Sequence, residues 1–168
     1  IYDKGHEKIA EDWLQLNNID KFILIHPFSG GSAKNITDAQ YSELIEKILE
    51  ESKDYSVVIS SSIQDKERAE KIKESLKFEN VYVFANEGSL LNLAATIDKC
   101  KLFIGTSTGP THIAGALGKN IIGIYPIKKT QSPLRWGVYG NKNVTYILPE
   151  GEKEEDYRTK DFISWGKK

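Results

Sequence analysis

A loop rich in glycine and serine carries groups suited to binding an oxyanion. Ser29 and Ser32 flank two glycines, and Lys34 follows two residues later. Hydroxyls, backbone amides and a lysine can surround a phosphate, and a helix predicted to begin near Thr37 would add its positive end. The loop matches neither GxxxxGK[ST] nor GxGxxG, and a flexible turn beside a solvated lysine explains it equally well.

A second loop, residues 105–112 with the sequence GTSTGPTH, combines four hydroxyls, two glycines and a histidine. It lies where a predicted strand turns into a predicted helix. Hydroxyls and helix N-terminal amides suit a phosphate or a sugar oxygen. An ordinary helix cap at Ser107 or Thr108 explains one of the hydroxyls but not all four. Gly109 and His112 complete the candidate set from this loop.

Other candidates are single charged residues after predicted strands. The Asp65 carboxylate could accept two ribose hydroxyls, or could simply interact with the start of a helix. Arg135 and neighbouring lysines could neutralise phosphates or lie in a solvated loop. The three histidines have no metal-ligand spacing, and there is one cysteine. We therefore predict no essential metal and no other cofactor.

Short apolar runs alternate with amphipathic segments along the chain, which predicts a parallel sheet covered by helices on both faces. The fold class is thus α/β, a three-layer, doubly wound parallel sheet. Loops are expected at 60–62 and 85–88, and the polar loops all fall at the carboxyl ends of strands, where such sheets bind ligands. The predicted strands are 22–25, 55–59, 81–84, 102–104, 121–125 and, more weakly, 144–148. The predicted helices are 5–16, 37–49, 65–76, 89–98 and 110–117.

The length of 168 residues is typical of one domain. We predict a linker helix at 1–20, a Rossmann-like domain at 21–150 and a tail at 151–168 that could form a helix. The net charge of -1 argues against nucleic acid as a partner, and no apolar run reaches membrane-spanning length. The chain begins with Ile1 and contains no methionine, so we expect it to be a piece of a longer protein.

The run 102–119 resembles the signature of lipopolysaccharide heptosyltransferases, glycosyltransferase family 9, in which Asp-Thr/Ser-Gly-x-x-His precedes a small-residue helix. The stretch from His26-Pro27 to Lys34 is similar to the family's His-Pro-Gly loop and its following lysine. Asp65, just before Glu67-Arg68-Ala69, stands where the family has an acidic ribose ligand. The resemblance covers residues 22–130.

The resemblance implies half of a GT-B fold, which consists of two Rossmann-like domains with the active site between them. This chain would be the C-terminal domain, which binds a nucleotide-sugar donor of the ADP-heptose type for an inverting, metal-independent transfer in lipopolysaccharide core synthesis. The implied contacts are Ser29, Lys34, Ser107, Thr108, Gly109 and His112 for the diphosphate and sugar, Asp65 for the ribose, and Asn86, Gly88 and Leu90 for the adenine.

The same resemblance places the catalytic base and the lipid-linked saccharide acceptor on a missing N-terminal domain. No catalytic residue is then expected in this chain, which would bind donor but be inactive alone. The whole enzyme would be cytoplasmic and could act at the inner face of the inner membrane. Ser107 replaces the family's aspartate, so the donor sugar stays open. The alternatives are a non-catalytic nucleotide-binding α/β module and half of another GT-B-like enzyme, such as a nucleotide-sugar epimerase.

Overall fold

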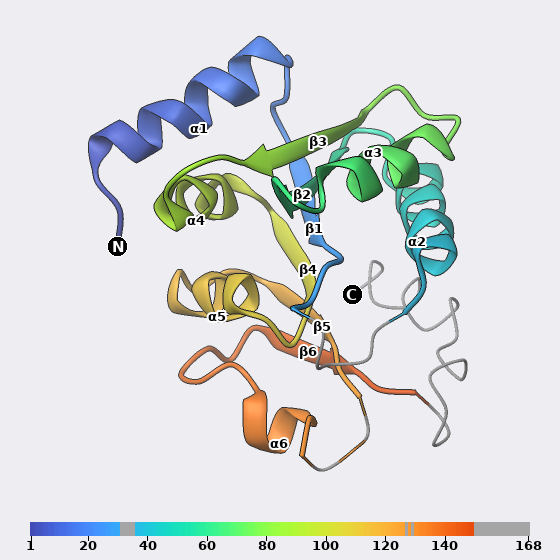
Figure 1. The fold of residues 1–168 in the computed structure, drawn as a ribbon, viewed down its shortest axis with the longest axis vertical. Coiled ribbons are helices and arrows are strands. Elements are labelled where there is room, and N and C mark those ends of the chain that lie inside the picture. The colour runs from blue at the N-terminus through green and yellow to red at the C-terminus, as the bar shows by residue number, and fades with distance from the viewer. Residues whose placement is uncertain (31–35, 127, 129, 150–168) are drawn as a thin grey trace.

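The core of the molecule is a sheet of six parallel strands, seen in a computed structural model that describes residues 1–30, 36–126, 128 and 130–149. The strands are β1 (Phe22–His26), β2 (Ser56–Ser62), β3 (Val81–Asn86), β4 (Leu102–Thr106), β5 (Ile121–Ile124) and β6 (Val144–Ile147). Their order across the sheet is β3-β2-β1-β4-β5-β6, with every neighbouring pair parallel (Figure 1).

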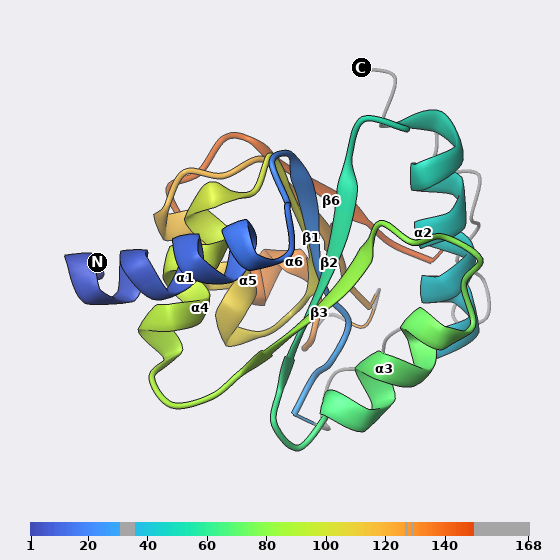
Figure 2. The ribbon, with the colours of Figure 1, turned by 90° about the horizontal axis from the view of Figure 1, so that it is seen from above.

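Helices cover both faces of this sheet. They are α1 (Lys4–Leu16), α2 (Asp38–Glu51), α3 (Lys66–Glu74), α4 (Leu90–Lys99), α5 (Gly109–Ala116) and the short α6 (Pro133–Trp136). Figure 2 shows α2 and α3 on one side of the sheet, and α1, α4 and α5 on the other. The predicted three-layer, doubly wound α/β fold is therefore confirmed.

Two separate apolar cores follow from the burial of the strands on both faces. In β1, Ile23 and Ile25 belong to the core under α2 and α3, whereas Phe22 and Leu24 belong to the core under α1, α4 and α5. Successive side chains of a strand point to opposite faces, so a strand that is buried on both faces is mostly apolar. All five residues of β1 are buried, and the first four are apolar.

The start of α2 has the predicted capping box. The amide of Gln40 donates to Thr37 Oγ1 at 3.2 Å, and the amide of Thr37 donates to Gln40 Oε1 at 2.8 Å. Two of the four orphan amides at this helix end are satisfied in this way. The helix end is therefore fixed by local sequence, at the point where the chain leaves the first polar loop.

The prediction of loops at 60–62 and 85–88 is wrong in part. Residues 60–62 form the last part of β2, and 85–86 form the end of β3. The reason is pairing: Ser60, Ser61 and Ser62 align with Phe84, Ala85 and Asn86, so the ladder continues through side chains that do not look strand-forming. β-Propensity depends on this kind of context.

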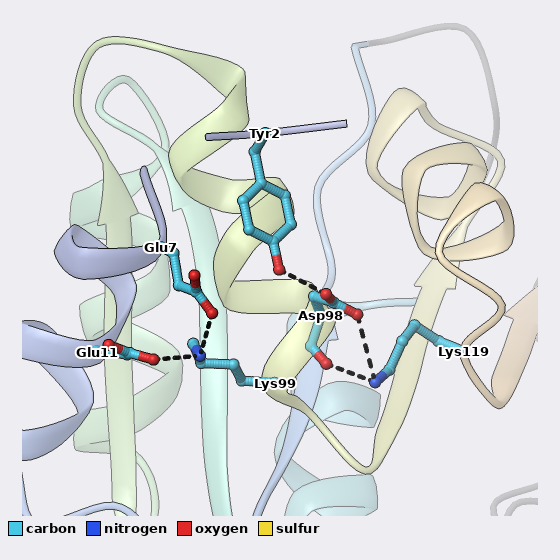
Figure 3. Close-up of polar contacts among 6 residues, drawn as sticks. All are labelled: Tyr2, Glu7, Glu11, Asp98, Lys99 and Lys119. Atoms are coloured by element: carbon cyan, nitrogen blue, oxygen red, sulfur yellow. Dashed lines mark hydrogen bonds and ion pairs between the residues drawn. The ribbon is translucent and has the colours of Figure 1, made fainter. Parts of the chain in front are cut away.

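Helix α1 is fastened to the end of α4 by polar contacts (Figure 3). The Tyr2 hydroxyl donates to the carboxylate of Asp98, and burial, followed by this contact, raises the pKa of Tyr2 to about 12. Lys99 Nζ lies 2.8 Å from Glu11 Oε1 and 3.5 Å from Glu7 Oε1. Residues 1–20 thus include a helix packed on the domain, and their role as an interdomain linker stays a prediction.

The predicted tail, with its proposed helix, lies outside the described residues. Each helix that the structure describes is too short or too polar to cross a bilayer.

Candidate functional site

The polar loops meet where the direction of strand order changes. β1 and β4 are neighbours, with His26 aligned to Gly105, yet the chain leaves β1 toward α2 on one face and leaves β4 toward α5 on the other. A crevice forms at such a switch point outside the carboxyl ends of the strands, and it is the usual ligand position in open α/β sheets. The two loops singled out in the sequence are those after β1 and β4.

A cavity of about 490 Å³ opens beside the start of α5, and we call it the α5 pocket. One wall is made by the turn between β4 and α5, and the other by the segment that follows β5. Its lining consists of Ser107, Thr108, Gly109, His112, Thr130, Gln131, Arg135 and Trp136. The structure thus brings together the four candidates predicted from the second polar loop.

Thr108 occupies the N-cap position of α5 but does not act as a side-chain cap. Its backbone is extended, with φ -142° and ψ 168°, and its side chain makes no capping hydrogen bond. Its Oγ1 is buried and has no hydrogen-bond partner in the part of the chain that the structure describes. A buried, unpaired hydroxyl is costly unless a ligand or water completes it. The simple helix-cap explanation of this hydroxyl therefore fails.

Ser107 is connected to the opposite wall of the pocket through Tyr125. The Tyr125 side chain is fully buried, and its hydroxyl donates to the backbone oxygen of Trp136 at 3.1 Å. Burial, with a smaller contribution from Tyr146, raises the pKa of Tyr125 to about 12, while a hydrogen bond from Ser107 opposes the rise. Ser107 therefore donates to Tyr125 and can present only its lone pairs to a ligand.

The second wall is held in place by close packing. A methyl group at Gly115 of α5 would lie 2.0 Å from Val138 Cγ1, so the segment after α6 approaches the helix backbone directly. Trp136 Nε1 donates to the backbone oxygen of Thr130 at 2.9 Å. The sequence identified Arg135 as a candidate in this segment but missed Thr130, Gln131 and Trp136. No local pattern marks these residues, because a tertiary contact brings them to the pocket.

The loop after β1 borders a different cavity, of about 530 Å³, which we call the α2 pocket. Ser29 lines this pocket and not the described part of the α5 pocket. Its described lining is Pro27, Ser29, Ile36, Thr37, Asp38, Ala39 and Arg68. Lys34, the other candidate from this loop, lies outside the described residues. Arg68 and Asp38 are lining residues that sequence reasoning did not assign to a site.

The candidate ribose and adenine contacts lie at or just beyond the carboxyl ends of β2 and β3. Asp65 Oδ2 accepts a hydrogen bond from Ser62 Oγ at 2.8 Å, and Ser62 is aligned with Asn86 across β2 and β3. The Oδ1 atom of Asn86 is buried with no partner among the described residues. Gly88 has φ +84°, and the Leu90 side chain is half exposed. The described linings of the two cavities do not include these four residues.

His26 ends β1 as a buried histidine that stays neutral. Its Nδ1 lies 2.9 Å from Ser60 Oγ, and the side chain is almost completely buried. Burial lowers its pKa to about 4, although the Asp65 carboxylate and a hydrogen bond to the Ser60 backbone act in the opposite direction. Because this imidazole is uncharged, His26 does not contribute positive charge to the binding of an anion.

Comparison with known proteins shows which family the chain resembles. Residues 3–165 match the family model described as glycosyltransferase family 9 (heptosyltransferase). A putative glycosyltransferase of Haemophilus influenzae is 31% identical over 161 residues, which is 92% of this chain and 46% of that protein. The lipopolysaccharide core heptosyltransferase OpsX of the same organism is 26% identical over 162 residues, or 96% of this chain and 45% of that protein.

A solved structure, that of the ADP-heptose lipopolysaccharide heptosyltransferase II of E. coli, superposes with a TM-score of 0.75 at 21% identity, covering 100% of this chain and 54% of that one. The chain spans less than half the length of the two curated relatives. The match to the family model covers almost the whole sequence, and the resemblance seen at residues 102–119 is thereby confirmed: the chain belongs to glycosyltransferase family 9.

Proposed function

We propose that this chain is the donor-binding part of an inverting, metal-independent glycosyltransferase of lipopolysaccharide core synthesis, and that its donor is a nucleotide sugar of the ADP-heptose type. The single observation that carries the proposal is Thr108. Its buried hydroxyl lacks a described partner, at the first turn of α5, in a cavity beside the switch point of the sheet. An oxyanion of the donor would satisfy this hydroxyl and the helix N-terminus together.

The remaining contacts follow the order of the strands. The diphosphate would lie between the loops after β1 and β4, in contact with Ser29, Lys34, Thr108 and Gly109. His112 and Ser107 would face the sugar end of the diphosphate. The alignment of Ser62 with Asn86 supports a nucleoside running along β2 and β3, because it places the partner of Asp65 next to the candidate adenine contacts. The ribose would then meet Asp65, and the adenine would meet Asn86, Gly88 and Leu90.

In the proposed reaction this chain stabilises the leaving group. When the bond from the sugar to the diphosphate breaks, negative charge grows on the diphosphate oxygens. The Thr108 hydroxyl, the amides at the start of α5 and the Lys34 ammonium would stabilise that charge by preorganised electrostatics rather than by proton transfer. We assign the catalytic base and the lipid-linked saccharide acceptor to the half of the relatives' length that this chain does not span.

The identity of the sugar depends on Ser107. A serine hydroxyl accepts fewer hydrogen bonds than the carboxylate typical of the family at this position, and here it is also engaged with Tyr125. The family membership favours a heptose, and the side-chain oxygen of Gln131 on the opposite wall would accept hydrogen bonds from sugar hydroxyls in place of a carboxylate. A panel of ADP-sugars titrated into the protein tests this assignment.

Calorimetric titration with ADP tests the site. We expect the wild-type chain to bind ADP and Thr108→Val to bind about 10- to 150-fold more weakly, since a hydrogen bond to a charged group contributes about 1.5–3 kcal/mol. Thr145→Val, on β6 at the far edge of the sheet, is the matched control and should bind like wild type. Absence of ADP binding by the wild type overturns the proposal, and a preference for UDP would favour the epimerase alternative.

A further inference from the structure

Arg68, in the first turn of α3, contacts both ends of the loop between β1 and α2. Its Nε lies 2.7 Å from one oxygen of the Asp38 carboxylate, and its Nη2 lies 2.6 Å from the other. The guanidinium carbon lies 5.1 Å from the centre of the Phe28 ring. Asp38 is the first residue of α2, and Phe28 lies two residues beyond the end of β1.

These two contacts use different parts of one rigid group. The edge of the guanidinium is paired with a carboxylate in the bidentate geometry that arginine favours, and its face lies over an aromatic ring. Phe28 is itself buried, so it gives the arginine a fixed surface. A lysine offers a point charge and cannot reproduce both contacts at once. Arg68 therefore sets the separation between Phe28 and Asp38 more narrowly than a simple ion pair would.

The pair of Arg68 and Asp38 is about half exposed, with side-chain exposures of 52% and 40%. Exposed ion pairs of this kind contribute little to the stability of a whole domain. Their position, however, is specific: Arg68, Asp38 and the candidate diphosphate ligand Ser29 border the same α2 pocket. The main consequence of the contact is therefore expected in the geometry of the pocket rather than in the free energy of unfolding.

We propose that Arg68 is a positioning residue of the donor site, which holds Ser29 and the first turn of α2 at the separation required by the donor diphosphate. This proposal rests on the proposed function, because it takes the diphosphate as the ligand. Arg68 acts through Phe28 and Asp38 and does not itself touch the donor. The Asp65 carboxylate, which would face the ribose in the proposed site, accepts a hydrogen bond from Ser62 and interacts with the Arg68 charge through space.

A direct role of Arg68 as a phosphate ligand makes the opposite prediction for Asp38. In that case the Asp38 carboxylate would compete with the phosphate for the guanidinium of Arg68. Removal of the Asp38 charge would then free the guanidinium and tighten ADP binding. If Arg68 positions the loop, loss of either partner opens the same contact and weakens binding. The sign of the Asp38 effect therefore distinguishes the two roles.

The test is ADP titration of Arg68→Lys, Asp38→Asn and the double variant. We expect each single variant to bind ADP about fivefold more weakly than wild type. The double variant should bind no more weakly than the single variants, because either substitution alone already breaks the contact between Arg68 and Asp38. Adenosine, which has no phosphates, should bind all variants equally. Glu67→Gln, which breaks the exposed pair of Glu67 with Lys71 on the same helix, is the control and should not change ADP binding.

Tighter ADP binding by Asp38→Asn would overturn the positioning role, and so would unchanged binding by both single variants. Equal losses for adenosine and ADP would reduce Arg68 to a general structural residue. Amide hydrogen exchange over 28–30 and 36–40 in the protein without nucleotide gives an independent reading. It should accelerate in Arg68→Lys and Asp38→Asn but not in Glu67→Gln. Failure of the wild type to bind ADP would contradict the proposed function, whereas unchanged exchange would contradict the positioning contact itself.

Discussion

Ser107 and Tyr125 are joined by a hydrogen bond that crosses from the β4–α5 turn to the end of β5. The Tyr125 hydroxyl in turn donates a hydrogen bond to the backbone oxygen of Trp136. The two walls of the α5 pocket are thus linked through one buried phenol. Ser107, a ligand candidate from the sequence, therefore also helps to hold the opposite wall of the α5 pocket.

Replacing Tyr125 by phenylalanine should destabilise the domain, because it removes the hydroxyl that links the two walls of the α5 pocket. The change leaves the Trp136 carbonyl and the Ser107 hydroxyl without their common partner, and we expect a loss of about 1–3 kcal/mol in the free energy of unfolding. Urea denaturation measures this loss. Tyr139→Phe is the matched control, because the Tyr139 side chain is 99% exposed, and its midpoint should equal that of wild type. Equal midpoints for both variants would mean that the bonds of Tyr125 contribute nothing net.

Two glycines of α5 should respond differently to an added methyl group. At Gly115 the methyl would overlap Val138, so Gly115→Ala should destabilise the domain by about 1–3 kcal/mol through overpacking. At Gly109 nothing lies within 4 Å of the added carbon, so Gly109→Ala should leave the free energy of unfolding nearly unchanged. Thermal denaturation measures both.

The same pair of variants also separates stability from binding. Gly109 lines the α5 pocket, so its added methyl should weaken ADP binding in a protein of normal stability. Shortening Val138 to alanine in the Gly115→Ala background should restore part of the lost stability. A double variant as unstable as Gly115→Ala alone would exclude the overlap as the cause.

The buried histidine should make the stability depend on pH. The pKa of His26 is lowered to about 4 in the folded protein, against about 6.5 for an ordinary histidine, so the unfolded chain binds more protons between these values. Stability should therefore fall as the pH drops from about 6.5 to about 4. The full difference corresponds to about 3 kcal/mol at most.

His26→Asn removes the titrating group and keeps a polar atom for Ser60. Carboxylates titrate in the same range, so the measurement is the difference between the denaturation curves of wild type and variant across this pH range. The wild type should lose stability more steeply than the variant as the pH falls. Parallel curves would show that the imidazole titrates alike in the folded and unfolded chains.

The fold could be predicted from the sequence because its signals are local. Apolar runs such as that of β1 and the capping box at Thr37 and Gln40 need only neighbouring residues, and both are present in the structure. The serines at the end of β2 were predicted as a loop because their strand conformation depends on pairing with β3. Propensity carries no information about such partners.

Only one wall of the α5 pocket could be predicted from the sequence. The β4–α5 turn holds four lining residues of one pocket within six positions, so its composition marked it. The opposite wall, with Trp136 and Gln131, depends on the approach of Val138 to Gly115, and the contact of Arg68 with Asp38 joins residues 30 positions apart. Such tertiary contacts leave no pattern in a single sequence.

Helix α4 joins two regions of the domain that are far apart in the sequence. It begins at Leu90, a candidate adenine contact, and its last two residues, Asp98 and Lys99, contact Tyr2, Glu7 and Glu11 (Figure 3). A ten-residue helix is about 15 Å long. The contacts that hold α1 and the candidate adenine contacts therefore lie about one helix length apart on a single rigid element.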